Sequence, residues 1–312
     1  MNKPRVIRLG TRASLLARTQ SELVAAAVRQ RLGCEVELVE VSTEGDVDRS
    51  ALATIGGTGV FVGALRDALL RGEVDVAVHS LKDLPTVPCE GITLAAVPGR
   101  EDPRDVVVAR DGLTLGELPV GSVVGTGSPR RAAQLHALGF GLEVVEIRGN
   151  VDTRVGKVLA GEVDAVLLAR AGLARIGRLD DVTEVMDPLQ MLPAPGQGAL
   201  AVECRSDDTA LVDDLMVLDD PHARAAVTAE RAVLTALEAG CSSPVGALAE
   251  IVEGDDGDEL WIRAVALSAD GGLTVRMSAS GPTGDAFGVG TRLAEQMLDD
   301  GAADLMDAPA RK

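Results

Sequence analysis

Short apolar runs alternate with amphipathic stretches along the first two thirds of the chain, and this alternation predicts an α/β protein. Residues 74–79, VDVAVH, are rich in valine and follow Gly72, which favours a strand of a covered, mostly parallel sheet over a segment of helix. Residues 15–33 instead place apolar side chains at helical spacing and end at Gly33, a residue typical of helix ends. Further strand-like runs lie at residues 6–10, 35–41, 92–97, 105–109, 123–126, 142–149, 164–169 and 199–204.

The order of these runs predicts two similar α/β lobes. The first lobe extends to about residue 98, and a charged segment containing Pro103 is interpreted as a crossover into the second lobe, which extends to about residue 187. A segment rich in Pro and Gly follows, and the strand-like run at its end is apolar enough to rejoin the first lobe. Two lobes joined by crossing connections form a cleft, so we expect a ligand to bind there.

The last third of the chain predicts a smaller α+β domain. Residues 223–239 form a helical pattern that Gly240 stops, and Cys241 follows at once in a loop. Three strand-like runs come next, at residues 247–252, 260–268 and 273–280, with a turn between the last two and a closing helix at residues 287–300. We therefore place domain 1 at residues 1–99 and 195–218, domain 2 at residues 100–194 and domain 3 at residues 219–312.

The loop after residues 74–79 is the first candidate for chemistry. It sets His79, Ser80, Lys82 and Asp83 side by side at the carboxyl end of the predicted strand. Ligands of open α/β sheets bind outside the carboxyl ends of the strands, so an acid beside an ammonium group is a plausible functional pair there. A solvated Lys82–Asp83 pair on the surface fits this segment equally well.

Arginines also gather where predicted strands give way to helices. Arg12 and Ser14 follow one strand, and the N–H groups of a helix start with an arginine fork beside them form an anion site. The same arrangement recurs at three further junctions, which carry Thr126, Ser128, Arg130 and Arg131, then Arg148 and Arg154, and finally Arg175. A single arginine is more often part of a surface salt bridge or packed along apolar surface. Several at the ends of parallel strands would converge and bind a ligand with many acid groups.

Composition narrows the range of functions. The formal net charge of −18 argues against binding nucleic acid or anionic membrane surfaces, because both need a basic footprint. Only four of the 30 basic residues are lysines, and an acidic, lysine-poor surface is favoured in a high-salt cytoplasm, although a generally acidic protein fits as well. The four cysteines show no metal-ligand spacing, so we expect free thiols and no metal.

Location and oligomeric state follow from what the sequence lacks. No stretch is long and apolar enough to span a membrane, and the first residues lack the apolar core of an export signal, which predicts a cytoplasmic protein. No apolar surface pattern demands a partner, so a monomer is expected.

Ten segments in order resemble the porphobilinogen deaminase family, also called hydroxymethylbilane synthases, along nearly the whole chain. The most specific are HSLKDLP at residues 79–85 and GQGA at residues 196–199. The others are GTRASLLARTQ, STEGD, GVFVGAL, EDPRDVVV, GTGSPRRAAQL, IRGNVDTR, AGLARIG and ERAVLTALEAGCSSPVGA.

The resemblance implies a reaction. In this family a thiol matching Cys241 carries a covalent dipyrromethane through a thioether, although a cysteine taken alone is more often a small buried apolar residue. Four porphobilinogen molecules are added to the free end with loss of ammonia, and the linear tetrapyrrole hydroxymethylbilane is released by hydrolysis. The catalytic carboxylate of the family matches Asp83, which would stabilise the positive charge that develops as ammonia leaves and would move protons. Uroporphyrinogen-III synthase would then receive the product by hand-off.

Matching positions also imply the binding residues, which would hold the acetate and propionate groups that each pyrrole unit brings. Those for the cofactor are Cys241, Lys82, Thr126, Ser128, Arg130, Arg131, Arg148, Gln197, Gly198 and Ala199. Those for the substrate are Arg12, Ser14, Phe61, Arg154 and Arg175. Phe61 would lie beneath the rings, with ordinary core packing as the alternative. Many relatives carry lysine in the mobile Gly-rich loop where this chain has Thr58, a departure that weakens one anion contact.

A solute-binding module is the alternative from another functional class. Two α/β lobes with crossing connections also describe type II periplasmic binding proteins, and such a module could use the same arginines to capture an organic dianion. The lack of an export signal and the additional domain with a cysteine on a loop argue against it. The expected fold is therefore two periplasmic-binding-protein-like (type II) α/β lobes with crossing connections plus a smaller α+β C-terminal domain.

Overall fold

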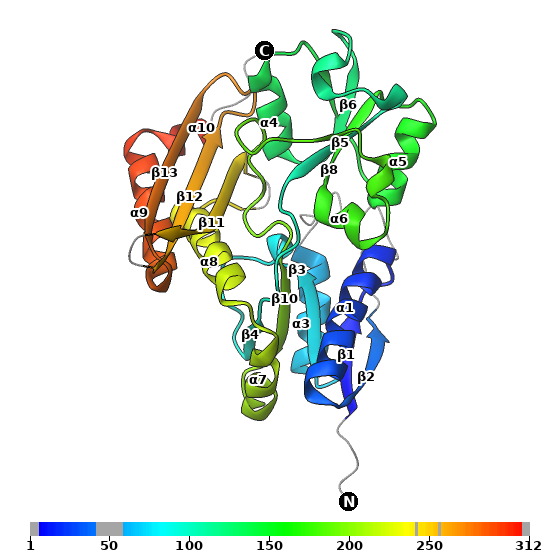
Figure 1. Cartoon of the computed structure of the whole chain (residues 1–312), viewed down its shortest axis with the longest axis vertical. Helices are drawn as coiled ribbons and strands as arrows, with labels where there is room; N and C mark the ends of the chain where they lie inside the picture. Colours follow the sequence, from blue (N-terminus) through cyan, green and yellow to red (C-terminus); the bar gives the residue numbers. More distant parts are fainter. Residues whose placement is uncertain (1–5, 42–58, 241–242, 255–256, 308–312) are drawn as a thin grey trace, which may run out of the picture. The chain divides into compact units, whose positions relative to one another are not determined.

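The computed structural model describes residues 6–41, 59–240, 243–254 and 257–307, except for the side chains of residues 59–61 (Figure 1). The chain divides into two compact units, which are described one at a time. Unit 1 comprises Met1–Arg100 and Ala199–Arg224, and unit 2 comprises Glu101–Gly198 and Ala225–Lys312. The three domain ranges expected from the sequence stay a prediction. No helix in the described ranges is long and apolar enough to cross a membrane.

Unit 1 is built on a five-stranded sheet with the strand order β2-β1-β3-β10-β4. Its strands are β1 (Val6–Thr11), β2 (Glu35–Glu40), β3 (Val76–Ser80), β4 (Ile92–Ala96) and β10 (Leu200–Arg205). β1 runs parallel to β2 and β3, whereas β10 runs antiparallel to β3 and β4. The run that follows the Pro- and Gly-rich segment is β10, so the prediction that it rejoins the first lobe is confirmed.

The helices of unit 1 pack on this sheet through apolar faces. They are α1 (Leu15–Leu32), α3 (Gly59–Leu70) and α7 (Thr209–Leu215), and α8 (Pro221–Ala236) begins here. Val24 and Val28 on α1 join Leu9 and Val202 in one buried cluster, which fixes the helix across the sheet. Gly33 follows α1 in the left-handed conformation with φ of 65°, and this confirms the predicted helix end.

Unit 2 contains a second five-stranded sheet with the order β7-β6-β8-β5-β9. Its strands are β5 (Asp105–Ala109), β6 (Val123–Thr126), β7 (Glu143–Glu146), β8 (Ala165–Ala169) and β9 (Glu184–Val185), and its helices are α4 (Pro129–Leu138), α5 (Val151–Leu159) and α6 (Arg170–Arg175). β6 runs parallel to β7 and β8, and β5 runs antiparallel to β8 and β9. The strand β7 ends three residues earlier than the run at 142–149 suggests.

The two five-stranded sheets share one topology. In each, three parallel strands are followed by a strand antiparallel to them in the fourth position, and an edge strand that runs antiparallel to the fourth lies in the fifth. The antiparallel strand is β10 in unit 1, which comes after the second lobe in sequence, and β5 in unit 2, which comes before the other strands of its sheet. The lobes therefore have the type II periplasmic-binding-protein-like fold with crossing connections.

A third sheet in unit 2 is antiparallel and forms the smaller C-terminal domain (Figure 1). Its strands are β11 (Val245–Gly254), β12 (Gly257–Leu267) and β13 (Thr274–Pro282), and α9 (Ala286–Asp299) and α10 (Ala302–Asp307) follow. Apolar residues of α8, α9 and the sheet form one core, to which α9 contributes Val289, Leu293 and Met297. The predicted turn and the closing helix are confirmed, whereas α10 is not predicted by the sequence pattern.

The end of α8 corrects the sequence prediction. The helix ends at Ala236 and not at Gly240, because Glu238 adopts φ of 50° and the Ala239 N–H donates to the Leu234 carbonyl at 2.9 Å. A non-glycine residue thus supplies the left-handed turn. Short turns of 3-10 helix complete the fold, at Leu81–Asp83, Arg110–Gly112, Leu115–Glu117, Leu179–Asp181, Met216–Leu218 and Thr283–Asp285.

Candidate functional site

The carboxyl ends of β1 and β3 lie at one edge of the unit 1 sheet, since the two strands run parallel. The antiparallel strand β10 begins at the same edge: Leu200 pairs with Ser80, and the Leu81 N–H donates to the Ala199 carbonyl at 3.0 Å. Such an edge is where α/β sheets bind ligands. The structure brings one group of predicted residues to it, namely Arg12, Ser14, Lys82, Asp83 and Ala199.

Asp83 ends the turn of 3-10 helix that starts directly after β3. Two apolar side chains hold the turn in place, because Leu81 is fully buried and Leu84 is 4% exposed. The Asp83 side chain itself is half-buried, and within the described ranges its carboxylate has no hydrogen bond or ion pair. The Lys82–Asp83 surface pair that fits the sequence equally well is therefore not formed.

Hydroxyl groups at this edge help to define the backbone. The Ser14 Oγ accepts a hydrogen bond from the Ala17 N–H at 3.3 Å and so caps α1, while Gln20 on α1 donates to the Ser80 Oγ at 3.0 Å. The first bond caps α1, and the second ties α1 to the end of β3. The prediction that Ser14 lies at a helix start is confirmed.

A buried cluster of charged and polar side chains lies next to this edge, within the sheet. The sequence analysis did not predict it. Glu203 on β10 accepts two hydrogen bonds from Arg66 on α3, at 2.7 and 3.0 Å, and its Oε2 lies 3.3 Å from the His79 Nε2. Burial would raise the pKa of Glu203, but His79 and Arg66 outweigh that effect and hold the pKa at about 2. The cluster therefore joins α3, β3 and β10 immediately before the turn that carries Asp83.

The equivalent edge of unit 2 begins at the Gly turn between β6 and α4. Thr126 is buried, and its Oγ1 accepts a hydrogen bond from the Ser128 N–H at 3.2 Å. The Ser128 Oγ accepts in turn from the Arg131 N–H at 3.4 Å and caps α4. Both hydroxyl oxygens act as acceptors in this turn, so each O–H remains available as a donor to a ligand oxygen.

Arg130 and Arg131 flank a fully buried carboxylate, that of Asp105 at the start of β5. Arg130 donates to one carboxylate oxygen at 2.8 Å, and Arg131 donates to the other at 2.8 and 3.2 Å. Gln197 donates to the Arg131-bound oxygen at 2.8 Å. Burial would raise the pKa of Asp105, but the charges of the two arginines outweigh it and hold the pKa far below its usual range. Sequence analysis named the arginines and Gln197, but not the acid between them.

Arg154 and Arg175 differ from these paired arginines. Both are half-buried, and in the part of the chain that the structure describes they donate only to backbone carbonyls, those of Gly149 at 2.8 Å and Gly198 at 2.5 Å. Burial lowers the pKa of both guanidinium groups, and the charge of Arg131 lowers that of Arg154 further. In a chain of net charge −18, such unneutralised guanidinium groups are typical of an anion site.

Arg148 does not share this arrangement. Its side chain is 67% exposed and forms a 3.0 Å pair with Glu146, which is equally exposed. Cys241 and Thr58 lie outside the described residues, and so does the side chain of Phe61. Among the residues that are described, no cluster of three or more His, Cys, Asp or Glu could hold a metal ion.

Several solved structures resemble the chain in fold. A periplasmic substrate-binding protein of an ABC transporter from Coxiella burnetii covers 68% of this chain and 91% of its own, at 16% identity and a TM-score of 0.43. An ancestral arginine-binding protein covers 69% of this chain and 92% of its own, at 19% identity and a TM-score of 0.39.

Protein families and curated relatives match the chain more closely. The family model "Porphobilinogen deaminase, dipyromethane cofactor binding domain" matches residues 7–213, and the model "Porphobilinogen deaminase, C-terminal domain" matches residues 224–299. Porphobilinogen deaminase 1 of Streptomyces coelicolor is 58% identical, and the match covers 98% of this chain and 99% of that protein. Porphobilinogen deaminase of Mycobacterium tuberculosis is also 58% identical, and the match covers 96% of this chain and 98% of that protein. These matches leave no support for the solute-binding alternative. The chain belongs to the porphobilinogen deaminase family.

Proposed function

We propose that this chain joins four porphobilinogen molecules into hydroxymethylbilane with Asp83 as the catalytic carboxylate and Cys241 as the attachment point of the dipyrromethane. One observation carries the assignment of Asp83: its carboxylate has no protein partner in the described ranges. By contrast, Asp75, Asp105 and Glu203 are paired with arginine, and the buried Glu230 accepts from two backbone N–H groups. A carboxylate left unpaired at the carboxyl edge of a sheet is available to a cationic ligand.

Asp83 suits the chemistry of the substrate. Porphobilinogen loses ammonia from its aminomethyl group, and positive charge then develops on the pyrrole that must be attacked. A carboxylate about 4 Å from that charge stabilises it by about 4 kcal/mol at an effective dielectric constant of 20. Asp83 would also accept and return protons at its carboxylate oxygens, as general acid–base catalysis requires. The rigid turn between two buried leucines keeps the group in place for each repeat.

The cofactor fits the donors that the structure displays. The Arg130 Nε is buried and has no hydrogen-bond partner among the described residues, and Arg154 and Arg175 donate only to carbonyls. A group that bears several carboxylates would satisfy such donors. When bound, the dipyrromethane supplies the free pyrrole end that the next unit joins.

The binding residues divide by ligand. We assign to the cofactor Cys241, Lys82, Thr126, Ser128, Arg130, Arg131, Arg148, Gln197, Gly198 and Ala199. To the substrate we assign Arg12, Ser14, Phe61, Arg154 and Arg175. We also propose that the chain acts as a monomer in the cytoplasm and hands its product to uroporphyrinogen-III synthase, and the net charge of −18 supports a role away from nucleic acid and anionic lipid.

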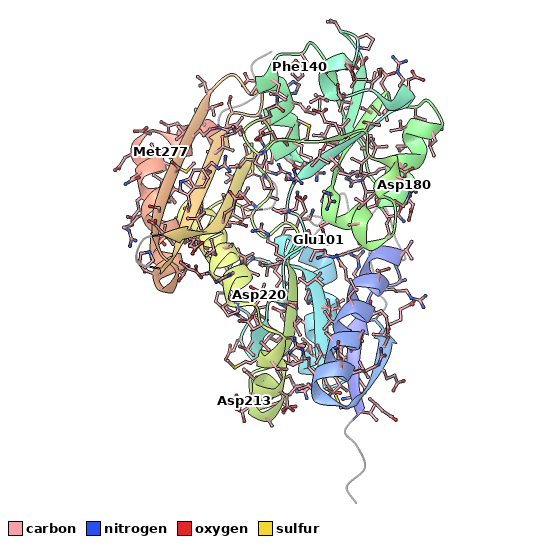
Figure 2. All side chains as sticks on the ribbon, in the orientation of Figure 1. Glu101, Phe140, Asp180, Asp213, Asp220 and Met277 are labelled. Atoms are coloured by element: carbon pink, nitrogen blue, oxygen red, sulfur yellow. The ribbon has the colours of Figure 1, made fainter. Side chains whose placement is uncertain are left out.

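Replacement of Asp83 by asparagine tests the assignment. Asp83→Asn keeps the shape of the side chain and removes the charge, so we expect turnover to fall at least about 100-fold, with the KM for porphobilinogen within about threefold of the original value. Porphobilinogen consumption by the purified holoenzyme is the measurement. Asp213→Asn is the control, because Asp213 is an exposed acid of the same unit on α7 (Figure 2), and it should leave turnover unchanged. Turnover of Asp83→Asn within threefold of the original would remove Asp83 from the mechanism.

A further inference from the structure

Asp105 has no place in the assignments above, yet it is the centre of a buried network in unit 2. It is fully buried at the first position of β5. One of its oxygens accepts from Arg130, and the other accepts from both Arg131 and Gln197. A single carboxylate thus contacts three residues that are assigned to the cofactor.

Each arginine of the network is fixed at a second point. Arg130 also donates to the Leu192 carbonyl, and Arg131 also donates to the Leu167 carbonyl at 3.0 Å. Both side chains are nearly inaccessible, at 4% and 7% exposure. Because carboxylate and carbonyl together define the plane of each guanidinium group, neither group can turn without the loss of a buried hydrogen bond.

The network leaves one donor unused. The Arg130 Nε is buried and has no hydrogen-bond partner among the described residues. A buried N–H without a partner is costly, so native proteins rarely keep one without a function. The balance of charge points the same way, since two guanidinium groups and one carboxylate leave a single positive charge.

We propose that Asp105 is a positioning residue for the dipyrromethane: it holds Arg130, Arg131 and Gln197 in fixed directions so that the arginine pair meets a cofactor carboxylate with one net positive charge. The inference rests on the proposed function, which assigns those three residues to the cofactor. Asp105 itself touches neither cofactor nor substrate in this account. Asp105 affects cofactor binding only by holding the two arginines in position.

A purely structural role is the competing explanation, because the loss of any buried ion pair destabilises a protein. Unit 1 offers a matched control in Asp75, which is 8% exposed and also lies between two arginines. Arg8 donates to it at 2.8 and 3.1 Å, and Arg205 lies 3.8 Å away. Asp75 directly precedes β3, so it lies at the end of that strand opposite to Asp83.

The test compares Asp105→Asn with Asp75→Asn in the full-length protein. Intact-protein mass spectrometry gives the fraction of purified chains that carry two pyrrole units, and denaturant unfolding gives the stability of each variant. We expect both variants to lose stability. Asp75→Asn should stay almost fully loaded, whereas loading of Asp105→Asn should fall about tenfold, which is the loss of one charge-assisted hydrogen bond. Equal loading of the two variants would overturn the proposal.

The same data separate this inference from the proposed function. If the unsubstituted protein carries no added pyrrole mass, the proposed function is contradicted. If both the unsubstituted protein and Asp105→Asn are fully loaded with dipyrromethane, only the role of Asp105 is contradicted. If Asp105→Asn does not fold, Asp105→Asn/Arg130→Gln takes its place, since it removes the uncompensated positive charge. Its control is Arg130→Gln alone, because Arg130 is itself assigned to the cofactor, and equal loading of the double variant and Arg130→Gln would refute a positioning role.

Discussion

Among single residues, Glu203 shows how a buried acid supports the sheet edge that carries Asp83. Its carboxylate joins Arg66 and His79, two residues on different elements, and its side chain is 4% exposed. The interactions with Arg66 and His79 more than offset the cost of burial, so the pKa of Glu203 lies near 2. The acid is therefore charged in the folded protein at any pH above about 2.

Replacement of Glu203 by glutamine should destabilise unit 1 in a pH-dependent way. At neutral pH we expect Glu203→Gln to lower the free energy of unfolding by about 3 kcal/mol, because the pKa falls from its unfolded value near 4.5 to about 2. The lowered pKa makes this stabilisation complete above pH 4.5 and lost as the pH falls toward 2. Urea unfolding of both proteins should thus show the difference shrink to less than half near pH 3.

The control for this experiment is Glu73→Gln, since Glu73 forms a solvent-exposed pair with Arg71. That variant should unfold like the original protein at each pH. A difference between Glu203→Gln and the original that stays constant from neutral pH to pH 3 would contradict the depressed pKa.

Single residues also mark the limit of sequence-based prediction at the site. Asp83 and the arginines could be found because each stands beside a local strand-to-helix signal. Asp105 and Glu203 could not, because their partners are distant in sequence: Glu203 lies 137 residues from Arg66, and Asp105 lies 25 residues from Arg130. A local pattern locates cations, but only the folded sheet brings their counter-charges to them.

At the scale of elements, a glycine marked the true end of α1, whereas the glycine after α8 did not mark the end of that helix. Gly33 closes α1 in the left-handed region, where glycine has no steric cost. Glu238 also adopts the left-handed region, in the turn after α8. Glutamate has no preference for that region, so the sequence pattern does not predict this turn. The sequence pattern predicted every described strand except the two-residue β9, whereas the exact ends depend on partners such as the four-residue pairing of β6 with β7.

Two glycine substitutions should have opposite effects on stability. Gly33→Ala should destabilise the protein by about 1 kcal/mol, because an L side chain is disfavoured at φ of 65°. Gly156→Ala should stabilise it by about 0.5–1 kcal/mol, since Gly156 lies within α5 and, apart from its own helical backbone and chain neighbours, no described atom lies within 4 Å of the added Cβ. Thermal unfolding of both variants gives the two signs. A stabilised Gly33→Ala or a destabilised Gly156→Ala would contradict these conformations.

At the scale of the whole molecule, each lobe has the same sheet topology but takes its fourth strand from a different part of the chain. The composition of the run at 199–204 sufficed to predict that it returns to the first lobe, because a mostly apolar strand needs a covered sheet. The sequence could not reveal that it enters between β3 and β4. That choice depends on backbone pairing, which fixes Ala199 beside the turn that carries Asp83.

The central claim is that the chain carries a covalent dipyrromethane on Cys241, and the mass of the intact protein tests it most directly. The purified original chain should exceed its sequence mass by two pyrrole units, and Cys241→Ala should have its sequence mass and no activity. Cys89→Ala removes another thiol that is not fully buried and should keep the added mass. An original chain at its sequence mass that consumes porphobilinogen, or a Cys241→Ala variant that retains the added mass, would contradict the account.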